Sequence, residues 1–332
     1  MRVIPLLDRI WYAGHPLRWL LWPLSWLFIA LAAVRRSAYR VGLLKTYRAA
    51  VPVIVVGNIS VGGTGKTPFT IALCERLQQQ GWKPGIVSRG YGGHSEHYPL
   101  PVTAGSDPGK VGDEPLLLAQ RSSCPMRVDP IRSRAVAALC NEEDIDIVIS
   151  DDGLQHYALQ RDMEIVIVDA QRQHGNGMRL PAGPLRESPR RLEQATAVLF
   201  NGATEAVAGF KLGIEDMVNL ASGERAAIQT LQSQSMHAIA GIGNPQRFFQ
   251  TLRDLGLSPT EHAFDDHYAF TAADLDFADQ QPVLMTEKDA VKCRAFAQAH
   301  HWYLPVTAEL NAQAETVMDQ LMESLRISFR NS

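Results

Sequence analysis

A glycine-rich segment that ends in Gly-Lys-Thr carries the clearest chemical signal in the chain. It follows the β-branched run Val53–Val56 and precedes a stretch with helical periodicity, Phe69–Gln79. A buried strand, a glycine loop and a helix start, in this order, are typical of a phosphate-binding loop, because glycines let successive N–H groups face one anion and the helix N-terminus adds its dipole. The sequence predicts a nucleoside triphosphate site made by Ser60, Val61, Gly62, Gly63, Thr64, Gly65, Lys66 and Thr67.

Two side chains of this loop have predicted roles, and two positions depart from the usual pattern. Lys66 would neutralise β- and γ-phosphate oxygens, and the Thr67 hydroxyl would bind Mg²⁺. Ser60 stands where the common pattern has glycine, and Val61 stands where related loops often carry lysine. An ordinary glycine-rich turn between a strand and a helix is the alternative.

A pair of carboxylates, Asp151 and Asp152, follows a second apolar run, Ile147–Ser150. A carboxylate at the end of such a strand can hold Mg²⁺ opposite a phosphate-binding loop. Two adjacent carboxylates repel each other unless a cation or hydrogen-bond donors offset the charge. We therefore expect a metal-binding role, with a solvated turn as the alternative.

Two further acids and a histidine have two interpretations each. Asp113 opens a helix, where it could cap free N–H groups or accept a proton from an attacking hydroxyl. His267 follows two aspartates and could support a base or belong to a surface turn. Glu187 lies among the arginines of residues 184–191, which could serve Mg²⁺ and an anionic substrate or form a solvated charged surface.

The elements that must position these residues alternate between strand and helix. Apolar strands are expected at Val51–Val56, Pro84–Ser88, Ile145–Ser150, Glu164–Asp169 and Thr196–Asn201. Helices are expected between them at Thr67–Gln80, Glu114–Arg121 and Arg132–Glu142. This alternation predicts an α/β fold with a mostly parallel sheet flanked by helices, whose ligands lie at the carboxyl ends of the strands.

A second, smaller α/β unit is predicted after a polar and weakly patterned stretch. Its expected elements are a strand at Met236–Ala240, a helix at Gln246–Leu255, strands at Pro282–Met285 and Trp302–Val306, and a closing helix at Ala308–Leu325. The predicted organisation is an N-terminal helical segment (residues 1–45), a nucleotide-binding domain (46–205), a linker (206–235) and a smaller domain (236–332).

The N-terminal segment has the composition of a membrane element. Trp19–Val34 is apolar apart from Ser25 and is bounded by arginines. Four of the six tryptophans lie in or near this run. Indoles favour the headgroup boundary, and a run of this length falls short of the roughly 20 residues that span a bilayer. We expect a helix that inserts into one leaflet or barely spans, rather than a signal peptide or a buried hairpin helix.

Charge and cysteine usage exclude other classes. The net charge of −3 argues against nucleic acid as a partner, whereas residues 1–50 carry eight basic groups against one acid and suit an anionic membrane surface. The four cysteines are scattered without a Cys-x-x-Cys pair, so reduced thiols are expected.

Taken together, these segments resemble the bacterial tetraacyldisaccharide 4′-kinase family of lipid A biosynthesis. The matching motifs span nearly the whole chain: Gly57-Asn58, Gly62–Pro68, Ser88-Arg89-Gly90-Tyr91-Gly92, Gly112-Asp113-Glu114-Pro115, Asp151–His156, Pro184-Leu185-Arg186-Glu187, Asp266-His267-Tyr268 and Thr286-Glu287-Lys288-Asp289-Ala290.

The resemblance implies transfer of the ATP γ-phosphate to the 4′-hydroxyl of an acylated glucosamine disaccharide 1-phosphate, giving lipid IVA. It implies Asp113 as catalytic base paired with His267, Lys66 as a catalytic phosphate-binding lysine, and a Mg²⁺ set of Thr67, Asp151, Asp152 and Glu187. It also implies work at the cytoplasmic face of a bacterial inner membrane, and no obligate protein partner is inferred.

Two alternatives lack a small-molecule acceptor. One is a nucleotide-gated switch, although the Asn-Lys-x-Asp motif of guanine recognition is not present in the sequence. The other is a membrane-tethered ATPase whose nucleotide drives self-association.

Overall fold

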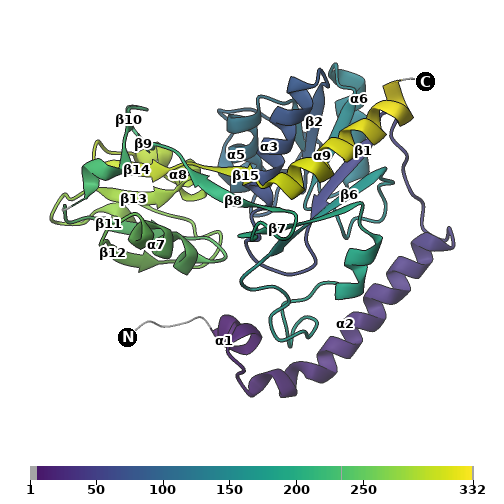
Figure 1. Ribbon diagram of the computed structural model, residues 1–332, viewed down its shortest axis with the longest axis horizontal. Coiled ribbons are helices and arrows are strands. Elements are labelled where there is room, and N and C mark those ends of the chain that lie inside the picture. The colour runs from purple at the N-terminus through teal and green to yellow at the C-terminus, as the bar shows by residue number, and fades with distance from the viewer. Residues whose placement is uncertain (1–5, 233, 331–332) are drawn as a thin grey trace.

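The computed structural model describes residues 6–232 and 234–330, and within them the strands form one sheet of nine and one of six. Figure 1 shows the larger sheet with its helices beside the smaller one, and a long N-terminal helix along the edge of the larger domain. Residues 1–5, 233 and 331–332, which belong to the predicted N-terminal segment, linker and smaller domain, lie outside the described residues.

The larger sheet has the predicted parallel α/β architecture. Its strand order is β15-β8-β7-β6-β1-β5-β2-β4-β3, and only the two edge pairs, β15 with β8 and β3 with β4, are antiparallel among the described strands. The strands are β1 (Val53–Gly57), β2 (Pro84–Ser88), β3 (Leu100–Val102), β4 (Met126–Val128), β5 (Ile147–Asp151), β6 (Met163–Asp169), β7 (Ala197–Asn201), β8 (Gly209–Ile214) and β15 (Val306–Leu310).

Helices cover both faces of this sheet because successive residues of each buried strand point to opposite sides. In β1, Ile54 and Val56 pack with α3 (Lys66–Gln79), α5 (Asp113–Ser122) and α9 (Ala312–Leu325). Val53 and Val55 pack on the other face with α6 (Arg132–Glu142). The short helix α4 (Pro108–Val111) leads into α5. The core therefore fixes the carboxyl ends of β1 and β5, where the phosphate loop and the paired aspartates begin.

The smaller sheet repeats this plan with fewer elements. Its order is β10-β9-β14-β13-β11-β12, in which the last four strands are parallel. The strands are β9 (Met217–Asn219), β10 (Arg225–Ala226), β11 (His237–Ala240), β12 (Thr260–Ala263), β13 (Val283–Thr286) and β14 (His301–Leu304), and the helices are α7 (Pro245–Asp254) and α8 (Glu287–Cys293).

The chain crosses between the two sheets twice, which changes the predicted domain limits. Residues 206–235 were expected as a linker, but they contain β8, which joins the larger sheet, and β9 and β10, which join the smaller one. Pro305 divides the strand expected at Trp302–Val306, and the next residues form β15 instead of the start of a helix. β15 pairs antiparallel with β8, and α9 then packs on the larger sheet. The residues of these two elements were expected in the smaller domain but belong to the larger one.

The N-terminal segment folds as two helices, α1 (Leu6–Tyr12) and α2 (Leu17–Arg40). Of α2, only Ser25 is buried, and the long apolar side chains Trp19, Leu20, Trp26 and Leu31 are more than half exposed. By length and composition α2 is able to cross a membrane, and 6% of its apolar window is buried against the protein. A buried hairpin helix, the structural alternative for this segment, is therefore wrong.

Candidate active site

The phosphate loop lies between β1 and α3, as the sequence predicts, and neighbouring side chains hold its shape. Asn58 Nδ2 donates to Thr64 Oγ1 at 3.3 Å, and Asn201 Nδ2 donates to the Thr64 carbonyl at 3.0 Å. Gly65 has a φ of +89°, and a Cβ there would lie 2.3 Å from Asn201 Nδ2. Glycine is therefore required at position 65 by both backbone conformation and space.

One N–H group of the loop already donates a hydrogen bond within the protein. Val61 N–H donates to the Pro184 carbonyl at 2.9 Å, and the neighbouring Ser60 is buried in a β-bridge with Leu185. Gly62 is half-buried, Gly63 is exposed, and no heavy atom lies within 4 Å of a Cβ built on Gly63. The open part of the loop that an anion can approach is thus Gly62 onward, up to Lys66 and Thr67 in the first turn of α3.

Lys66 lies between the loop and the paired aspartates. Its Nζ is 3.5 Å from Asp152 Oδ1, and Arg186 lies on the other side of the same carboxylate at 3.0 Å. Burial disfavours the charged form of Asp152, but Lys66 and Arg186 outweigh it and lower the pKa of this carboxyl. Asp152 is therefore ionised and holds the two cations that a phosphate would meet.

Asp151 is in the opposite electrostatic situation, although it is the adjacent residue. Its side chain is buried at the end of β5 and has one weak hydrogen bond, from Thr70 Oγ1 at 3.4 Å. Burial, with Glu114 nearby, raises the pKa of Asp151 to about 7. A buried carboxylate with so little compensation is a site where a divalent cation would relieve an energetic cost. The donor set therefore fits Mg²⁺.

Glu187 is connected to the aspartates through hydrogen bonds. Gln155 Nε2 donates to Glu187 Oε1 at 2.8 Å, Tyr157 donates to Glu187 Oε2 at 3.0 Å, and Arg186 contacts both Gln155 and Asp152. No three His, Cys, Asp or Glu side chains in the described part of the chain lie close enough to form a metal site by themselves. Mg²⁺ is usually bound by one or two carboxylates together with substrate phosphates, which is the arrangement available here.

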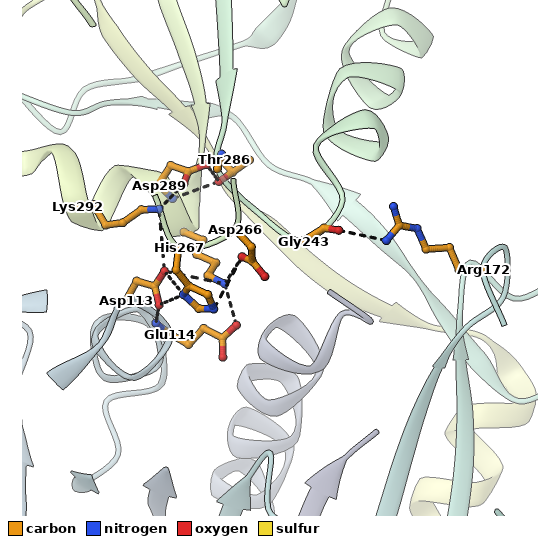
Figure 2. A network of polar contacts seen from close by, with 11 residues as sticks. Asp113, Glu114, Arg172, Gly243, Asp266, His267, Thr286, Asp289 and Lys292 are labelled. Carbon is orange, nitrogen blue, oxygen red and sulfur yellow. Dashed lines mark hydrogen bonds and ion pairs between the residues drawn. The ribbon is translucent and has the colours of Figure 1, made fainter. Parts of the chain in front are cut away.

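Asp113 and His267 come from different domains and meet in one contact. His267 Nδ1 lies 3.1 and 3.0 Å from the two carboxylate oxygens of Asp113, which is 5% exposed (Figure 2). His267 therefore does not form an isolated surface turn. Burial opposes the ionisation of both groups, but their mutual contact outweighs it, so the pKa of Asp113 is lowered and that of His267 is raised. The pair can therefore hold a proton between the two groups.

The helix-cap interpretation of Asp113 is only partly correct. Gly112 occupies the N-cap of α5, with a φ of +91°, and a Cβ there would lie 2.4 Å from the Tyr91 carbonyl oxygen. Asp113 is the first helical residue and accepts from the Glu114 N–H at 2.9 Å. One oxygen thus anchors the carboxylate on the helix while the group as a whole faces His267.

Residues of the smaller domain also close over the phosphate loop, and the sequence did not predict them. Arg172 donates to the Gly243 carbonyl at 3.1 Å (Figure 2), and a Cβ on Gly243 would lie 2.8 Å from the Gly63 nitrogen. Arg247 contacts Asp169 at 3.0 Å and Asn201 at 2.8 Å. The glycines of residues 241–243 were a signal of a tight turn, but sequence spacing does not say which other segment that turn meets.

A hollow of about 410 Å³ lies at the carboxyl ends of β6 and β7, and residues on both sides of Asn201, which bonds Thr64 of the phosphate loop, line it. It is lined by Ala170, Gln171, Gln173, Phe200, Gly202, Ala203, Thr204 and Val207. A second hollow of about 80 Å³ lies between α2 and the segment that carries Arg186 and Glu187.

Comparison with known proteins agrees with the arrangement. The family described as tetraacyldisaccharide-1-P 4'-kinase, LpxK, matches residues 17–325. The tetraacyldisaccharide 4'-kinase of Methylobacillus flagellatus is 52% identical over 320 residues, covering 95% of each chain. That of Hahella chejuensis is 47% identical over 332 residues, covering 98% of each chain.

A solved structure is similar over nearly the same extent. The crystal structure of LpxK from Aquifex aeolicus in complex with ATP has a TM-score of 0.76 and 28% sequence identity, and the match covers 93% of this chain and 99% of that chain. With a family match over most of the sequence and relatives at about half identity, the chain belongs to the tetraacyldisaccharide-1-P 4'-kinase family.

Proposed function

We propose that this chain transfers the γ-phosphate of ATP to the 4′-hydroxyl of tetraacyldisaccharide 1-phosphate, giving lipid IVA. The observation that carries the proposal is the contact between Asp113, on the nucleotide-binding domain, and His267, on the smaller domain. A proton-accepting pair beside a phosphate loop is what a kinase needs and a nucleotide switch does not. Family membership agrees with the same reaction.

ATP binds with its phosphates on the glycine loop. The N–H groups from Gly62 onward and the N-terminus of α3 face the phosphate oxygens, while Lys66 neutralises the charge on the transferred group. The hollow at the ends of β6 and β7, with a volume of about 410 Å³, would take the nucleoside, because Asn201 beside it bonds Thr64 of this loop. Its small lining residues leave room for a planar base against Phe200.

Mg²⁺ would be held by Asp151 or Asp152 with Thr67, while Glu187 orients the surrounding donors through Gln155. When bound, the ion neutralises charge on the phosphate oxygens. Lys66 and Arg186 remain paired with Asp152 until the nucleotide arrives, so the site is positively charged where the phosphate enters.

The Asp113–His267 pair accepts the proton of the attacking hydroxyl. As the oxygen–phosphorus bond forms and the bond to ADP breaks, the hydroxyl proton passes to the pair. The reactive form has His267 neutral and Asp113 ionised, because this form takes up a proton at His267, whose pKa is raised by its contact with Asp113. The form with His267 already protonated could bind another proton only through Asp113, whose pKa is lowered.

α2 supplies the membrane location. Its tryptophans are exposed, whereas Ser25 donates to the Arg179 carbonyl at 2.9 Å and Arg35 donates to the Gln155 carbonyl at 3.3 Å. Because these contacts hold one side of the helix against the catalytic domain, we propose that α2 lies in one leaflet, with its basic groups on anionic lipid. We place α2 at the cytoplasmic face of a bacterial inner membrane, as the family resemblance implies.

The lipid would enter beside α2. The smaller hollow there combines apolar side chains with arginines, as an acylated sugar phosphate requires, and is lined by Phe28, Ile29, Ala32, Ala33, Arg36, Tyr157, Arg179, Arg186, Glu187 and Ser188. No obligate protein partner is needed by this arrangement.

The test is a labelling assay with detergent-solubilised protein, Mg²⁺ and γ-labelled ATP, with and without tetraacyldisaccharide 1-phosphate. We expect label in the lipid, and its loss in Lys66→Ala. Label that appears only as free phosphate, whatever the lipid, would instead support the membrane-tethered ATPase.

A further inference from the structure

Lys288 is enclosed by three carboxylates from both domains. It lies on α8 of the smaller domain, with a side chain that is 16% exposed. Its Nζ is 3.0 Å from Glu114, 3.3 Å from Asp266 and 3.9 Å from Asp113. A lysine so placed joins α5 of the larger domain to the loop that carries His267. Nothing in the reaction described above uses it.

The helix that carries Lys288 is fixed in position by hydrogen bonds between its first residues and neighbouring segments. Thr286 donates to Asp289 Oδ2 at 2.6 Å, and the Gly241 N–H donates to the same oxygen at 2.9 Å. At the start of the helix, Glu287 accepts two hydrogen bonds from Arg121 of α5, at 2.8 and 2.9 Å. Lys288 therefore approaches Asp113 from a rigid element rather than from a mobile surface.

Carboxylates outnumber cations around the Asp113–His267 pair in the described part of the chain, and this lysine is one of the two cations that offset them. The acids are Asp113, Glu114, Asp266 and Asp289 (Figure 2), and the cations are Lys288 and Lys292. Lys292 is committed to Asp289 at 2.7 Å and lies 4.0 Å from Asp113. The Tyr91 ring also lies against the imidazole, at 4.8 Å between centroids.

Removing Lys288 would leave a strong excess of negative charge beside an imidazole. Such an environment favours the protonated imidazole, because an excess of carboxylates stabilises the cation. A protonated His267 fills the position that the substrate proton must take. We propose that Lys288 is a positioning residue that keeps the Asp113–His267 pair ready to accept a proton at neutral pH while it ties the two domains together at the site.

The role of Lys288 in proton acceptance rests on the proposed function, but its effect on the pKa values of Asp113 and His267 does not depend on catalysis. Lys288 acts to lower the pKa of both Asp113 and His267, against the raising effect of Asp266 on His267. Burial opposes the charge of Lys288 itself, but Glu114, Asp113 and Asp266 outweigh it and raise the pKa of this lysine. Its positive charge is therefore present over the whole pH range in which the pair titrates.

The direct test measures the pKa of His267 by NMR in the full chain labelled at histidine, in detergent. The signal is assigned by its loss in His267→Asn. Lys288→Gln should raise the pKa of His267 by roughly one unit, the size expected for one lost charge in a partly buried cluster. Lys288→Arg, which keeps the charge, should restore most of the original value.

A charge change of opposite sign keeps the test decisive if Lys288→Gln folds poorly. Asp266→Asn removes a carboxylate 3.8 Å from His267 Nε2 and should lower the pKa of His267. The matched control is Lys211→Gln, which removes an exposed lysine of β8 paired with Glu205 and should leave the His267 pKa unchanged.

The kinetic counterpart is the pH profile of kcat/KM. In Lys288→Gln its acidic limb should move to higher pH with the NMR value, so that activity is regained at alkaline pH. An equal loss at every pH with an unchanged His267 pKa would overturn the inference and leave Lys288 as a structural tie. A shifted pKa in a protein that transfers no label to lipid would uphold the electrostatic coupling and refute the proposed function.

Discussion

Gly65→Ala tests the phosphate loop through a contact that can be measured in the structure. Alanine at a φ of +89° is strained by about 1–2 kcal/mol. Its Cβ would also lie 2.3 Å from Asn201 Nδ2, so the hydrogen bond from Asn201 to the Thr64 carbonyl would be lost at about 1 kcal/mol. The substitution should therefore cost about 2–3 kcal/mol in total.

This free-energy cost can appear in the stability of the protein or in its affinity for ATP, and we predict the sum of the two losses. If the loop keeps its conformation, the loss appears in the free energy of unfolding and ATP affinity is retained. If the loop moves to relieve the strain, stability is retained and ATP affinity falls by roughly 30- to 150-fold, since each 1.4 kcal/mol is a factor of about ten. Calorimetric titration with ATP and denaturant unfolding without it measure the two parts.

Gly63→Ala is the matched control for stability. A Cβ at position 63 meets no heavy atom within 4 Å in the ligand-free protein, and Gly63 has no positive φ. Its free energy of unfolding should change by less than about 0.5 kcal/mol. If Gly65→Ala also changes both the free energy of unfolding and the free energy of ATP binding by less than about 0.5 kcal/mol, Asn201 does not constrain the loop and the reasoning is refuted.

Three further predictions concern pH and the membrane. Because the pKa of His267 is raised above its ordinary value of 6.5, kcat/KM for the lipid should fall as pH drops through that raised value, while ATP affinity stays constant. A rate that does not depend on pH between about 6 and 9 would contradict the proton-accepting role. Burial raises the pKa of Asp151 from 3.8 to about 7, so the contribution of this group to stability is lost as pH rises through 7. Without nucleotide and Mg²⁺, Asp151→Asn should therefore stabilise the protein by on the order of 3 kcal/mol at pH 8 and by much less at pH 5. An equal effect at both pH values would show that the carboxylate is not buried without compensation. Replacing the exposed Trp19, Trp22 and Trp26 together by alanine should weaken binding to anionic vesicles at least ~10-fold in flotation assays, and unchanged binding would assign the anchor to another surface.

The larger sheet was predictable from sequence because its strands are buried on both faces. Val53–Gly57 and Met163–Asp169 are apolar runs that lie within a few residues of the expected limits, and Pro84–Ser88 and Arg132–Glu142 match them. The family, the kinase activity and the use of ATP, all implied by the motifs, are confirmed by the comparisons.

The crossing between the domains was not predictable, for a physical reason. β15 is an edge strand and β8 is its neighbour, both have exposed residues and weak alternation, and their pairing joins residues 209–214 to residues 306–310. Long-range pairing of this kind leaves no local signal. The helix expected at Ala308–Leu325 was wrong in its first turn, since Asn311 caps α9 and the strand ends before it.

The candidate site was predicted in its residues but not in its connections. The roles of Asp113 and His267 followed from the family resemblance, and the structure adds their contact across two domains. The lysines of α8 and the arginines that meet Gly243 and Asn201 were missed, because charge in a sequence does not reveal which carboxylates it will face. The metal roles of Thr67, Asp151, Asp152 and Glu187 stay predictions.

The central claim is that Asp113 and His267 act as one proton-accepting unit, and a double-mutant cycle in the lipid transfer reaction tests it most directly. Single-turnover transfer from γ-labelled ATP is measured for Asp113→Asn, His267→Gln and the double variant, with ATP affinity measured for each. If the pair is one unit, each single variant loses at least ~100-fold in rate, the double variant is no slower than the slower single, and ATP affinity stays nearly intact. Losses that multiply in the double variant, or that follow ATP affinity, would contradict the claim.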